Sequence, residues 1–382
     1  MDYQTASIAL HRKTRGKLSI ESKVPLNDRD DLSLAYTPGV AGPCLAIAED
    51  RLLARELTAT KSMIAVISDG SAVLGLGDIG PEAALPVMEG KCVLFKRFGG
   101  LDAFPIVLGT QNVEEIIAVV KAIAPTFGGI NLEDISAPRC FEIEERLKAE
   151  LDIPVMHDDQ HGTAVVVLAG LINALKVADK KKEDVRVVVS GAGAAGVAIT
   201  KLLARYGFLH LVMCDSTGVI HRGRTDLNTE KIKILEITNQ ENKTGTLKEV
   251  LVGADIFLGI SKGNLLTSAD VRTMNTGAIV FAMANPTPEI SPEEARAGGA
   301  LIVATGRSDA PNQVNNSLAF PGIFRGAIDA RVRAITDDMK LSAAVALAAT
   351  VSVPTAEKII PGPFDPGILE AVSGAITGLK RE

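Results

Sequence analysis

Short apolar runs alternate with amphipathic segments throughout the first 160 residues. The runs end at Gly, Pro or Asp, which is typical of buried strands, and they are SMIAVISDG, SAVLGLGD, DAFPIVLGT, GGINLED and IPVMHDD. Between them, NVEEIIAVVKAIA and SAPRCFEIEERLKAEL have apolar residues at helical spacing and charges on the opposite face. This alternation predicts an N-terminal α/β domain.

A second series of apolar runs begins after the helical stretch GTAVVVLAGLINALKVA and the polar KKKED. The runs VRVVVS, HLVMCD, DIFLGI, AIVFAMA and LIVATG alternate with helical stretches, which predicts a Rossmann-like, doubly wound parallel sheet. The remainder, from PGIFRGAIDARVRAI to GILEAVSGAI, is predicted to form helices that pack back on the protein. We therefore expect two domains, residues 1–160 and residues 161–382.

Composition narrows the classes of function. Hydrophobic residues make up 47% and charged residues 23% of the 382 residues, and the net charge of −6 is not gathered in one tract. This mild, dispersed charge predicts neither a nucleic-acid partner nor binding to a membrane surface. The basic run 180–182 is interpreted as a solvated loop. We expect a small-molecule substrate.

The cellular compartment is indicated by segments that the sequence lacks. No uninterrupted apolar run reaches the roughly 18 residues of a membrane span, and the stretch MDYQTASIALHRKTRGKLSIESK has no apolar signal core. The four cysteines lie far apart and form no CxxC pair. A cytoplasmic location is predicted.

A glycine motif follows VRVVVS and opens the next helical stretch. Gly191 allows a tight turn, and Gly196 permits close helix packing. Gly193 lets the backbone approach a pyrophosphate, which would also lie beside Ala194. The strand after that helix ends in Asp215, at the distance expected of a ribose contact. This context predicts a nicotinamide dinucleotide site rather than a plain glycine-rich turn.

The choice between NAD and NADP stays open at this point. Asp215 would accept hydrogen bonds from the ribose hydroxyls of NAD and repel a 2′-phosphate. Ser216, Arg222 and Arg224 follow closely and could bind such a phosphate.

Acidic residues end two of the predicted strands in the first domain. Glu133 and Asp134 follow GGINL, and Asp158 and Asp159 follow IPVMH. Ligands bind at the carboxyl ends of strands in open α/β sheets, and oxygen ligands favour Mg²⁺ or Mn²⁺. We therefore consider Glu133, Asp134 and Asp159 as metal ligands, with helix capping and first-turn acids as an equal alternative.

Two histidines and a lysine are weaker candidates. His157 and His161 stand four apart, but DDQ between them is expected at a strand end, so hydrogen bonding to the acids is favoured over metal binding. Lys91 lies in the apolar stretch LPVMEGKCVLFKRFGG, where burial would require a partner or a neutral amine. A neutral lysine is a competent general base, although an exposed lysine on a helix is an equal alternative.

Taken together, these segments resemble the malic enzymes, specifically the short prokaryotic form. The stretches that carry the resemblance are LAYTPGVAGPC, ISDGSAVLGLGDIGPEAALPVMEGKCVLFKRFGG, INLEDISAPRCFEIE, HDDQHGTA, VVVSGAGAAG, FAMANPTPE and QVNNSLAFPG. The resemblance implies oxidative decarboxylation of (S)-malate to pyruvate and CO₂, with reduction of NAD or NADP and with Mg²⁺ or Mn²⁺ bound.

The resemblance also implies roles for individual residues. Lys91 becomes the general base and Tyr36 the general acid, which in short members is thought to reach the site from the neighbouring subunit of a homodimer or larger assembly. Asn285 and Asn316 would hold the substrate carboxylate, and Asn285 would also lie near the cofactor. The set Glu133, Asp134 and Asp159 would bind the metal, with Asp158 beside it.

The sequence departs from the larger relatives at one position. Ala72 aligns with an arginine that grips substrate in them, which leaves the grip on the carboxylate open. Ser216 matches several NADP-using relatives and favours NADP slightly. Some bacterial members continue into a phosphotransacetylase-like domain, so the chain is either a stand-alone enzyme or part of a longer one.

Two other classes of function compete with this interpretation. A metal-free NAD(P) dehydrogenase of another small acid would share the glycine motif and a lysine base. A catalytically silent module that senses a dinucleotide or metabolite would keep binding but lose turnover.

Overall fold

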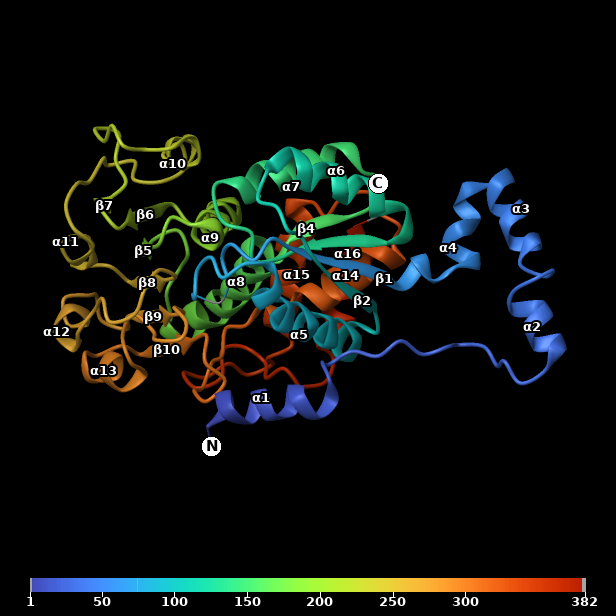
Figure 1. Cartoon of the computed structure of the whole chain (residues 1–382). Helices are drawn as coiled ribbons and strands as arrows, with labels where there is room; N and C mark the ends of the chain where they lie inside the picture. Colours follow the sequence, from blue (N-terminus) through green and yellow to red (C-terminus); the bar gives the residue numbers. More distant parts are fainter. Residues whose placement is uncertain (1, 74, 380–382) are drawn as a thin grey trace.

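Two parallel sheets form the framework of the protein. The computed structural model describes residues 2–73 and 75–379. The first sheet has the order β2-β1-β3-β4, all parallel, and comprises β1 (Met63–Ser68), β2 (Asp102–Val107), β3 (Gly129–Leu132) and β4 (Val155–His157). Helices α5 (Pro81–Gly99), α6 (Val113–Ile123) and α7 (Arg139–Glu150) connect or flank these strands, with the short η3 (Ala124–Thr126) after α6 (Figure 1).

One strand predicted in the first domain is wrong. The described residues of SAVLGLGD form a loop, in which Val73 N–H donates to the Gly77 carbonyl at 3.0 Å. Gly75 and Gly77 have φ angles of +75° and +85°, in the left-handed region that a strand cannot contain. The backbone conformation of the glycines, rather than the apolar residues between them, therefore determines the structure of this stretch.

The second sheet has the doubly wound order predicted from the apolar runs. Its order is β10-β9-β8-β5-β6-β7, and all neighbours are parallel except the short β7, which is antiparallel to β6. The strands are β5 (Arg186–Ser190), β6 (His210–Asp215), β7 (Gly218–Val219), β8 (Ile256–Gly259), β9 (Ile279–Ala282) and β10 (Ile302–Thr305). The helices that connect them are α9 (Ala194–Tyr206), α10 (Thr229–Ile234), α11 (Leu247–Leu251), α12 (Ser268–Val271) and α13 (Pro292–Ala297). The predicted α/β class is confirmed.

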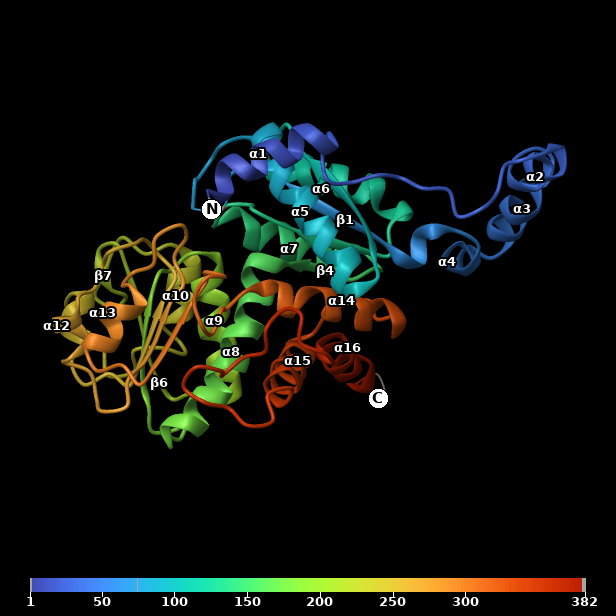
Figure 2. The ribbon, with the colours of Figure 1, turned by 90° about the horizontal axis from the view of Figure 1, so that it is seen from below.

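Helix α8 (Asp158–Ala178) joins the two sheets, as Figure 2 shows. It begins directly after β4, so the expectation that DDQ would not be helical is wrong: these residues are its first turn. By length and apolarity alone, α8 would pass as a membrane span among the described residues. However, 67% of its most apolar window is buried inside the protein, as in a core helix.

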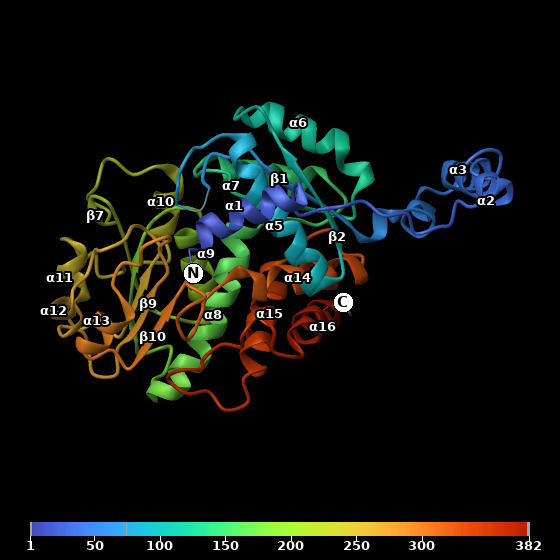
Figure 3. The same cartoon turned by 60° about the horizontal axis from the view of Figure 1, so that its bottom comes forward.

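The C-terminal helices pack against both domains. They are α14 (Phe320–Asp329), α15 (Asp337–Ala349) and α16 (Ile368–Gly378), preceded by η4 (Asn316–Leu318). Phe320 and Phe324 of α14 pack edge-on against Phe95 of α5, at ring-centroid distances of 4.6 and 5.4 Å, and α15 packs against α8 (Figure 3). One hydrophobic core therefore contains residues from both sides of position 160. The domain boundary there stays a prediction.

The N-terminal segment lies apart from this core. None of the described residues before Ile64 is buried. Helix α1 (Tyr3–Thr14) lies beside the body, whereas α2 (Arg29–Ala35), α3 (Ala41–Glu49) and α4 (Ala54–Leu57) extend away from it as an arm (Figures 1 and 2). The arm also contains η1 (Arg51–Leu53), and η2 (Ala59–Ser62) leads from it into β1. The name arm is used below for residues 24–57.

Candidate active site

The acidic residues predicted from the strand ends come together at one edge of the first sheet. Strands β3 and β4 are parallel neighbours, and Leu132 pairs with His157 in register. Glu133 and Asp134 therefore leave β3 at the level where Asp158 and Asp159 begin α8. One carboxylate oxygen from each of Glu133, Asp134 and Asp159 lies within 4.8 Å of the others.

Local structure separates the metal interpretation of these acids from the capping interpretation. Helix α7 begins only at Arg139, and its N-cap is Pro138, so Asp134 caps no helix. Asp134 has a φ of 53°, and its N–H donates to Asp159 Oδ2 at 2.8 Å. Asp159 does lie in the first turn of α8, where an acid is favourable. Capping therefore explains the position of Asp159 but not that of Asp134.

Lys91 of α5 lies buried between two of the acids. Its Nζ is 2.7 Å from Glu133 Oε1 and 2.7 Å from Asp158 Oδ2, it lies over the ring of Phe320, and the side chain is 6% exposed. The alternative of an exposed helical lysine is wrong. Burial disfavours the ammonium, but the two carboxylates outweigh burial and raise the lysine pKa. In the metal-free protein Lys91 is therefore charged and partnered, not neutral.

Burial also changes the pKa values of the other acids in the cluster. Burial raises the pKa of Asp158 to about 7 and that of Asp159 to about 6, although Lys91 opposes both shifts. Asp158 Oδ1 is buried and, among the described residues, has no hydrogen-bond partner. Carboxylates thus outnumber ammonium groups at this edge, and a divalent cation would balance that charge. The donor set fits Mg²⁺ or Mn²⁺, which prefer oxygen ligands.

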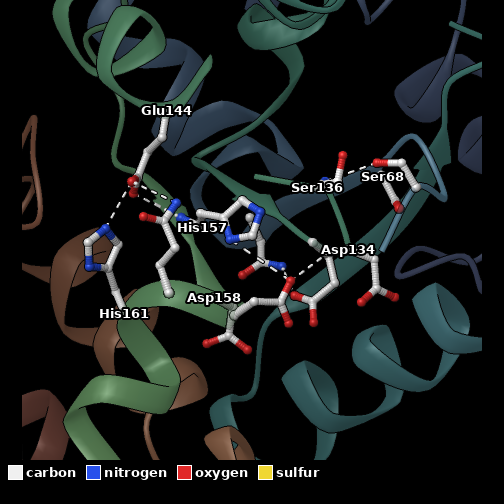
Figure 4. A network of polar contacts seen from close by, with 12 residues as sticks. Ser68, Asp134, Ser136, Glu144, His157, Asp158 and His161 are labelled. Atoms are coloured by element: carbon white, nitrogen blue, oxygen red, sulfur yellow. Dashed lines mark hydrogen bonds and ion pairs between the residues drawn. The ribbon is translucent and has the colours of Figure 1, made fainter. Parts of the chain in front are cut away.

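Both histidines contact Glu144 of α7, His157 through its backbone N–H and His161 through its ring. The His157 ring also lies beside the acidic cluster, with Nδ1 3.9 Å from Asp159 Oδ2. Glu144 Oε1 accepts from the His157 N–H at 3.0 Å, and Glu144 Oε2 is 2.9 Å from His161 Nε2 (Figure 4). Burial lowers the pKa of His161 to about 4, so its ring is neutral at neutral pH. Hydrogen bonding to an acid, the alternative favoured from the sequence, is the arrangement found for His161.

The glycine motif has the backbone conformation expected after β5. Gly191 has a φ of +121°, and a side chain there would meet the Ile260 carbonyl. A Cβ on Gly196 would lie 1.9 Å from the Gly191 carbonyl oxygen, so α9 packs closely on the turn. Gly193 is the N-cap of α9 and has open space around it, with Ala194 as the first helical residue. The helix N-terminus is thus accessible to a phosphate.

Asp215, at the end of β6, is already paired with two cations. Its carboxylate accepts from Arg224 through both oxygens, at 2.8 and 3.0 Å, and from Lys231 Nζ at 2.6 Å. Burial disfavours the carboxylate, but these donors outweigh burial and lower its pKa to about 2. Ser216 is exposed beside it. Arg222 points elsewhere, toward the carbonyls of residues 235 and 239.

Asn285 and Asn316 lie on separate loops that approach the first domain. A Cβ on Gly75 would lie 2.2 Å from the Asn285 carbonyl oxygen, so the loop after β1 meets the loop after β9. A Cβ on Gly162 of α8 would lie 1.8 Å from Asp158 Oδ1 and 3.2 Å from Asn316 Cβ. Asn316 is therefore adjacent to the acidic cluster, and Asn285 lies where the two domains meet.

Comparison with known proteins agrees with this geometry. The family model for the malic enzyme N-terminal domain matches residues 15–148, and the model for the malic enzyme NAD binding domain matches residues 160–365. The chain belongs to the malic enzyme family. The resemblance inferred from the sequence motifs is therefore confirmed.

Individual relatives are similar over nearly the whole chain. The bifunctional malic/malolactic enzyme of Bacillus subtilis is 55% identical over 100% of this chain and 94% of its own length. The NAD-dependent malic enzyme of Geobacillus stearothermophilus is 57% identical over 96% of this chain and 78% of its own. The NADP-dependent malic enzyme of Rhizobium meliloti is 49% identical over 96% of this chain but only 50% of its own length.

Among solved structures, the NAD-dependent malic enzyme of Thermotoga maritima has a TM-score of 0.95 to this chain. It is 51% identical, and the match covers 97% of this chain and 99% of that one. Relatives named for NAD and relatives named for NADP both occur at high identity, so this comparison leaves the cofactor preference open.

Tyr36, a site residue suggested by the malic enzyme motifs, is not brought to the cluster within the single chain. It caps the C-terminus of α2 on the arm and is 67% exposed. Figure 1 shows α2 at the far end of the arm, well away from β3 and β4. Within one chain, the candidate site is therefore incomplete.

Three residues of the site were missed in the sequence. Lys231 and Glu144 lie on polar helices where nothing in the pattern distinguishes them. Glu289 is fully buried and accepts from the N–H groups of Ser261 and Ala284, so it fixes the loop before Asn285. The signal for Glu289 was its place in FAMANPTPE, one of the malic enzyme stretches. Ala72 contributes only its N–H, to the Asp134 carbonyl at 3.0 Å.

Proposed function

We propose that this protein oxidises and decarboxylates (S)-malate to pyruvate and CO₂ while NAD(P)⁺ is reduced. The observation that carries the proposal is the buried Lys91 between Glu133 and Asp158, in a carboxylate cluster at the edge of the sheet. The second domain contributes the glycine motif, at which a bound dinucleotide would supply the hydride acceptor.

Glu133, Asp134 and Asp159 are the proposed ligands of Mg²⁺ or Mn²⁺. A divalent ion held there would polarise the C2 hydroxyl of malate and, after oxidation, the C2 carbonyl. Asn285 and Asn316 are proposed to orient the substrate carboxylate, since Asn316 is adjacent to Asp158 and Asn285 lies where the two domains meet. Orientation by such side chains would turn the single C2 hydrogen of malate toward the nicotinamide.

Lys91 is proposed to accept the proton of the C2 hydroxyl. A charged lysine has no free lone pair, so Lys91 must first lose the proton that Glu133 and Asp158 now stabilise. Once Glu133 serves as a ligand, it no longer stabilises the ammonium to the same extent. Asp158 Oδ2 lies 2.7 Å from Lys91 Nζ and is proposed to take that proton.

Tyr36 is proposed to protonate C3 of enolpyruvate in the site of a neighbouring subunit. The arm exposes several large apolar side chains and buries none within its own chain. Exposed apolar surface of this kind is typical of an interface. The exposed arm residues include Leu26, Leu32, Leu34, Leu45, Leu52 and Leu57. We therefore propose a homodimer or a larger assembly, in the cytoplasm.

The experiment that tests the function follows reduced nicotinamide formed from malate. NAD and NADP are compared with Mn²⁺ present or removed by chelator, and pyruvate is measured at the end. We expect reduction that requires the metal and yields one pyruvate per reduced cofactor, with NADP preferred. Reduction that is insensitive to chelator and yields no pyruvate would instead indicate a metal-free dehydrogenase. Folded, metal-loaded protein that binds cofactor and malate without reduction would indicate a sensing module.

A further inference from the structure

Asp134 needs support from outside the acidic cluster to hold its backbone conformation. Its φ of 53° lies in the left-handed region, which is unfavourable for a residue with a side chain and persists only where surrounding contacts enforce it. Its N–H donates to Asp159 Oδ2 at 2.8 Å, and its carbonyl accepts from the Ala72 N–H at 3.0 Å. Asp159 is itself a proposed metal ligand. The support that does not depend on the metal therefore comes from the loop after β1.

A second hydrogen bond joins this loop to the segment between Asp134 and α7. Ser136 N–H donates to Ser71 Oγ at 2.9 Å. The Ser71 hydroxyl also donates to Asp69 Oδ1 at 2.5 Å and accepts from Arg139 Nη2 at 3.0 Å. A hydroxyl has one donor and two acceptor positions, and all three are used here. The direction of the Ser71 hydroxyl is therefore fixed by its three partners.

Arg139 supplies the charge that keeps this arrangement in place. The side chain of Asp69 is fully buried, and Arg139 Nη2, 2.9 Å from Asp69 Oδ2, is its only ion-pair partner among residues 2–73 and 75–379. Without the guanidinium, the buried carboxylate would be uncompensated and would have to move toward water. That movement would displace Ser71, whose N–H and hydroxyl both donate to Asp69. Asp134 would then lose the support of the loop.

We propose that Arg139 is a positioning residue for the divalent metal. Through Asp69 and Ser71, it holds the backbone of Asp134 so that the carboxylate faces the other proposed ligands. Arg139 is the first residue of α7, which packs into the core through buried residues that include Ile143. A metal ligand is thus tied to a helix that is anchored outside the acidic cluster. The proposal rests on the proposed function, because it concerns the proposed ligands of the same metal.

The test measures Mn²⁺ binding to the full-length protein without malate or dinucleotide. Free Mn²⁺ is followed by electron paramagnetic resonance during the titration, and circular dichroism melting establishes that each variant is folded. Arg139→Met should raise the Kd of Mn²⁺ by about tenfold or more, as expected when a group that orients a metal ligand is lost. Arg139→Lys should restore most of the affinity, because a single nitrogen of the guanidinium makes the hydrogen bonds to both Asp69 and Ser71.

Turnover separates positioning of the metal from a general structural role. Arg139→Met should need about tenfold more Mn²⁺ for half-maximal turnover, whereas kcat at saturating Mn²⁺ should stay within a few-fold of wild type. A fall in kcat that saturating Mn²⁺ does not relieve would contradict the role assigned to Arg139.

A second variant tests the same link without leaving a buried charge unpaired. Ser71→Ala removes the hydroxyl between Arg139 and Ser136 but keeps the ion pair of Arg139 with Asp69. This variant should fold and bind Mn²⁺ about threefold or more weakly, the worth of one hydrogen bond. Arg146→Met is the matched control, since Arg146 lies on the same helix and pairs with Glu114 at the surface. It should leave the Kd of Mn²⁺ unchanged.

The outcomes distinguish this proposal from the proposed function. Wild-type affinity for Mn²⁺ in Ser71→Ala, or in folded Arg139→Met, would overturn the proposal, as would equal weakening in Arg146→Met. A wild-type protein that binds no Mn²⁺ would overturn the metal site and this proposal with it. If Mn²⁺ binds and Arg139→Met weakens it, but the wild-type protein does not oxidise malate, the proposed function alone is overturned.

Discussion

At the scale of single residues, Lys91 has two roles. Its positive charge stabilises the buried carboxylates, and its amine is the proposed general base. Its ammonium neutralises part of a buried carboxylate cluster, and removal of one partner from such a pair is strongly destabilising. A loss of activity in an alanine variant would therefore not separate chemistry from folding. Arginine can separate them, since it keeps the charge but is never deprotonated in proteins.

The Lys91→Arg variant is expected to fold but to lose activity. Turnover of malate should fall by roughly 10²-fold or more, because the general base is lost while an ion pair with Glu133 or Asp158 is kept. Lys91→Ala should lose turnover to a similar extent and also lower the melting temperature. Steady-state kinetics with Mn²⁺ and circular dichroism melting provide both readouts. Turnover of the arginine variant within a few-fold of wild type would exclude Lys91 as the base.

Sequence patterns located the acids of the site but not their partners. Glu133 and Asp159 could be predicted to converge, because parallel strands deliver their carboxyl ends to one edge. The contact between Lys91 and Asp158 joins residues 67 positions apart and depends on how α5 packs on the sheet. For the same reason, the sequence motif suggested that Asp215 would contact ribose, whereas two cations from later segments fill its acceptor positions.

At the scale of elements, helix α8 positions Asp158 because residue 162 is a glycine and has no side chain. Asp158 folds back over the first turn, and its Oδ1 occupies the space that a Cβ on Gly162 would need. The glycine therefore fixes the direction in which Asp158 points, toward Lys91. Since α8 is otherwise packed with buried apolar residues, its first turn cannot shift to relieve a clash there.

Gly162→Ala is expected to lower kcat by roughly 10²-fold, because the Asp158 carboxylate must move away from Lys91 by about an ångström or more. Gly374→Ala is the matched control, since Gly374 is an exposed helical glycine of α16 with open space around it. That variant should keep wild-type turnover and gain up to about 1 kcal/mol of stability from helix propensity. Kinetics and urea unfolding of the pair test this. Equal turnover in the two variants would contradict the role assigned to Gly162.

The helices and strands could be predicted wherever the spacing of apolar residues agreed with the Gly, Pro and polar residues at the ends of each segment. The strands ending in buried residues, such as VRVVVS and AIVFAMA, gave an unambiguous signal. SAVLGLGD was misassigned because its apolar residues alternate with glycines that adopt left-handed φ angles. The first turn of α8 was misassigned because a strand of only three residues passes directly into the helix, with no polar linker to mark the change.

At the scale of the whole molecule, the proposed site is divided between two regions that do not meet in one chain. Lys91 is buried in the body, and Tyr36 is exposed on the arm. A twofold assembly in which each arm reaches the other body would complete two equivalent sites. Periodicity could not predict the arm, because none of its residues is buried and its helices have no core-facing stripe.

Mixing two inactive variants should restore activity if sites are shared between subunits. In a Lys91→Arg and Tyr36→Phe heterodimer, one site combines an intact lysine with an intact tyrosine. Random reassociation should therefore recover about a quarter of the wild-type activity, one working site in half of the dimers. Each variant alone, unfolded and refolded in the same way, is the control. No recovery, with heterodimers demonstrated by differently tagged subunits, would indicate that Tyr36 does not act in trans.

Under the proposed assembly, the unburied arm makes the activity of this enzyme depend on its own concentration. An isolated subunit would hold every proposed metal ligand and its dinucleotide motif, yet it would lack the tyrosine of the proposed final protonation. Dilution below the dissociation constant of the assembly should therefore leave a species that oxidises malate but releases pyruvate slowly. The balance between oxidation and product release would then follow the amount of chain in solution, without any effector ligand.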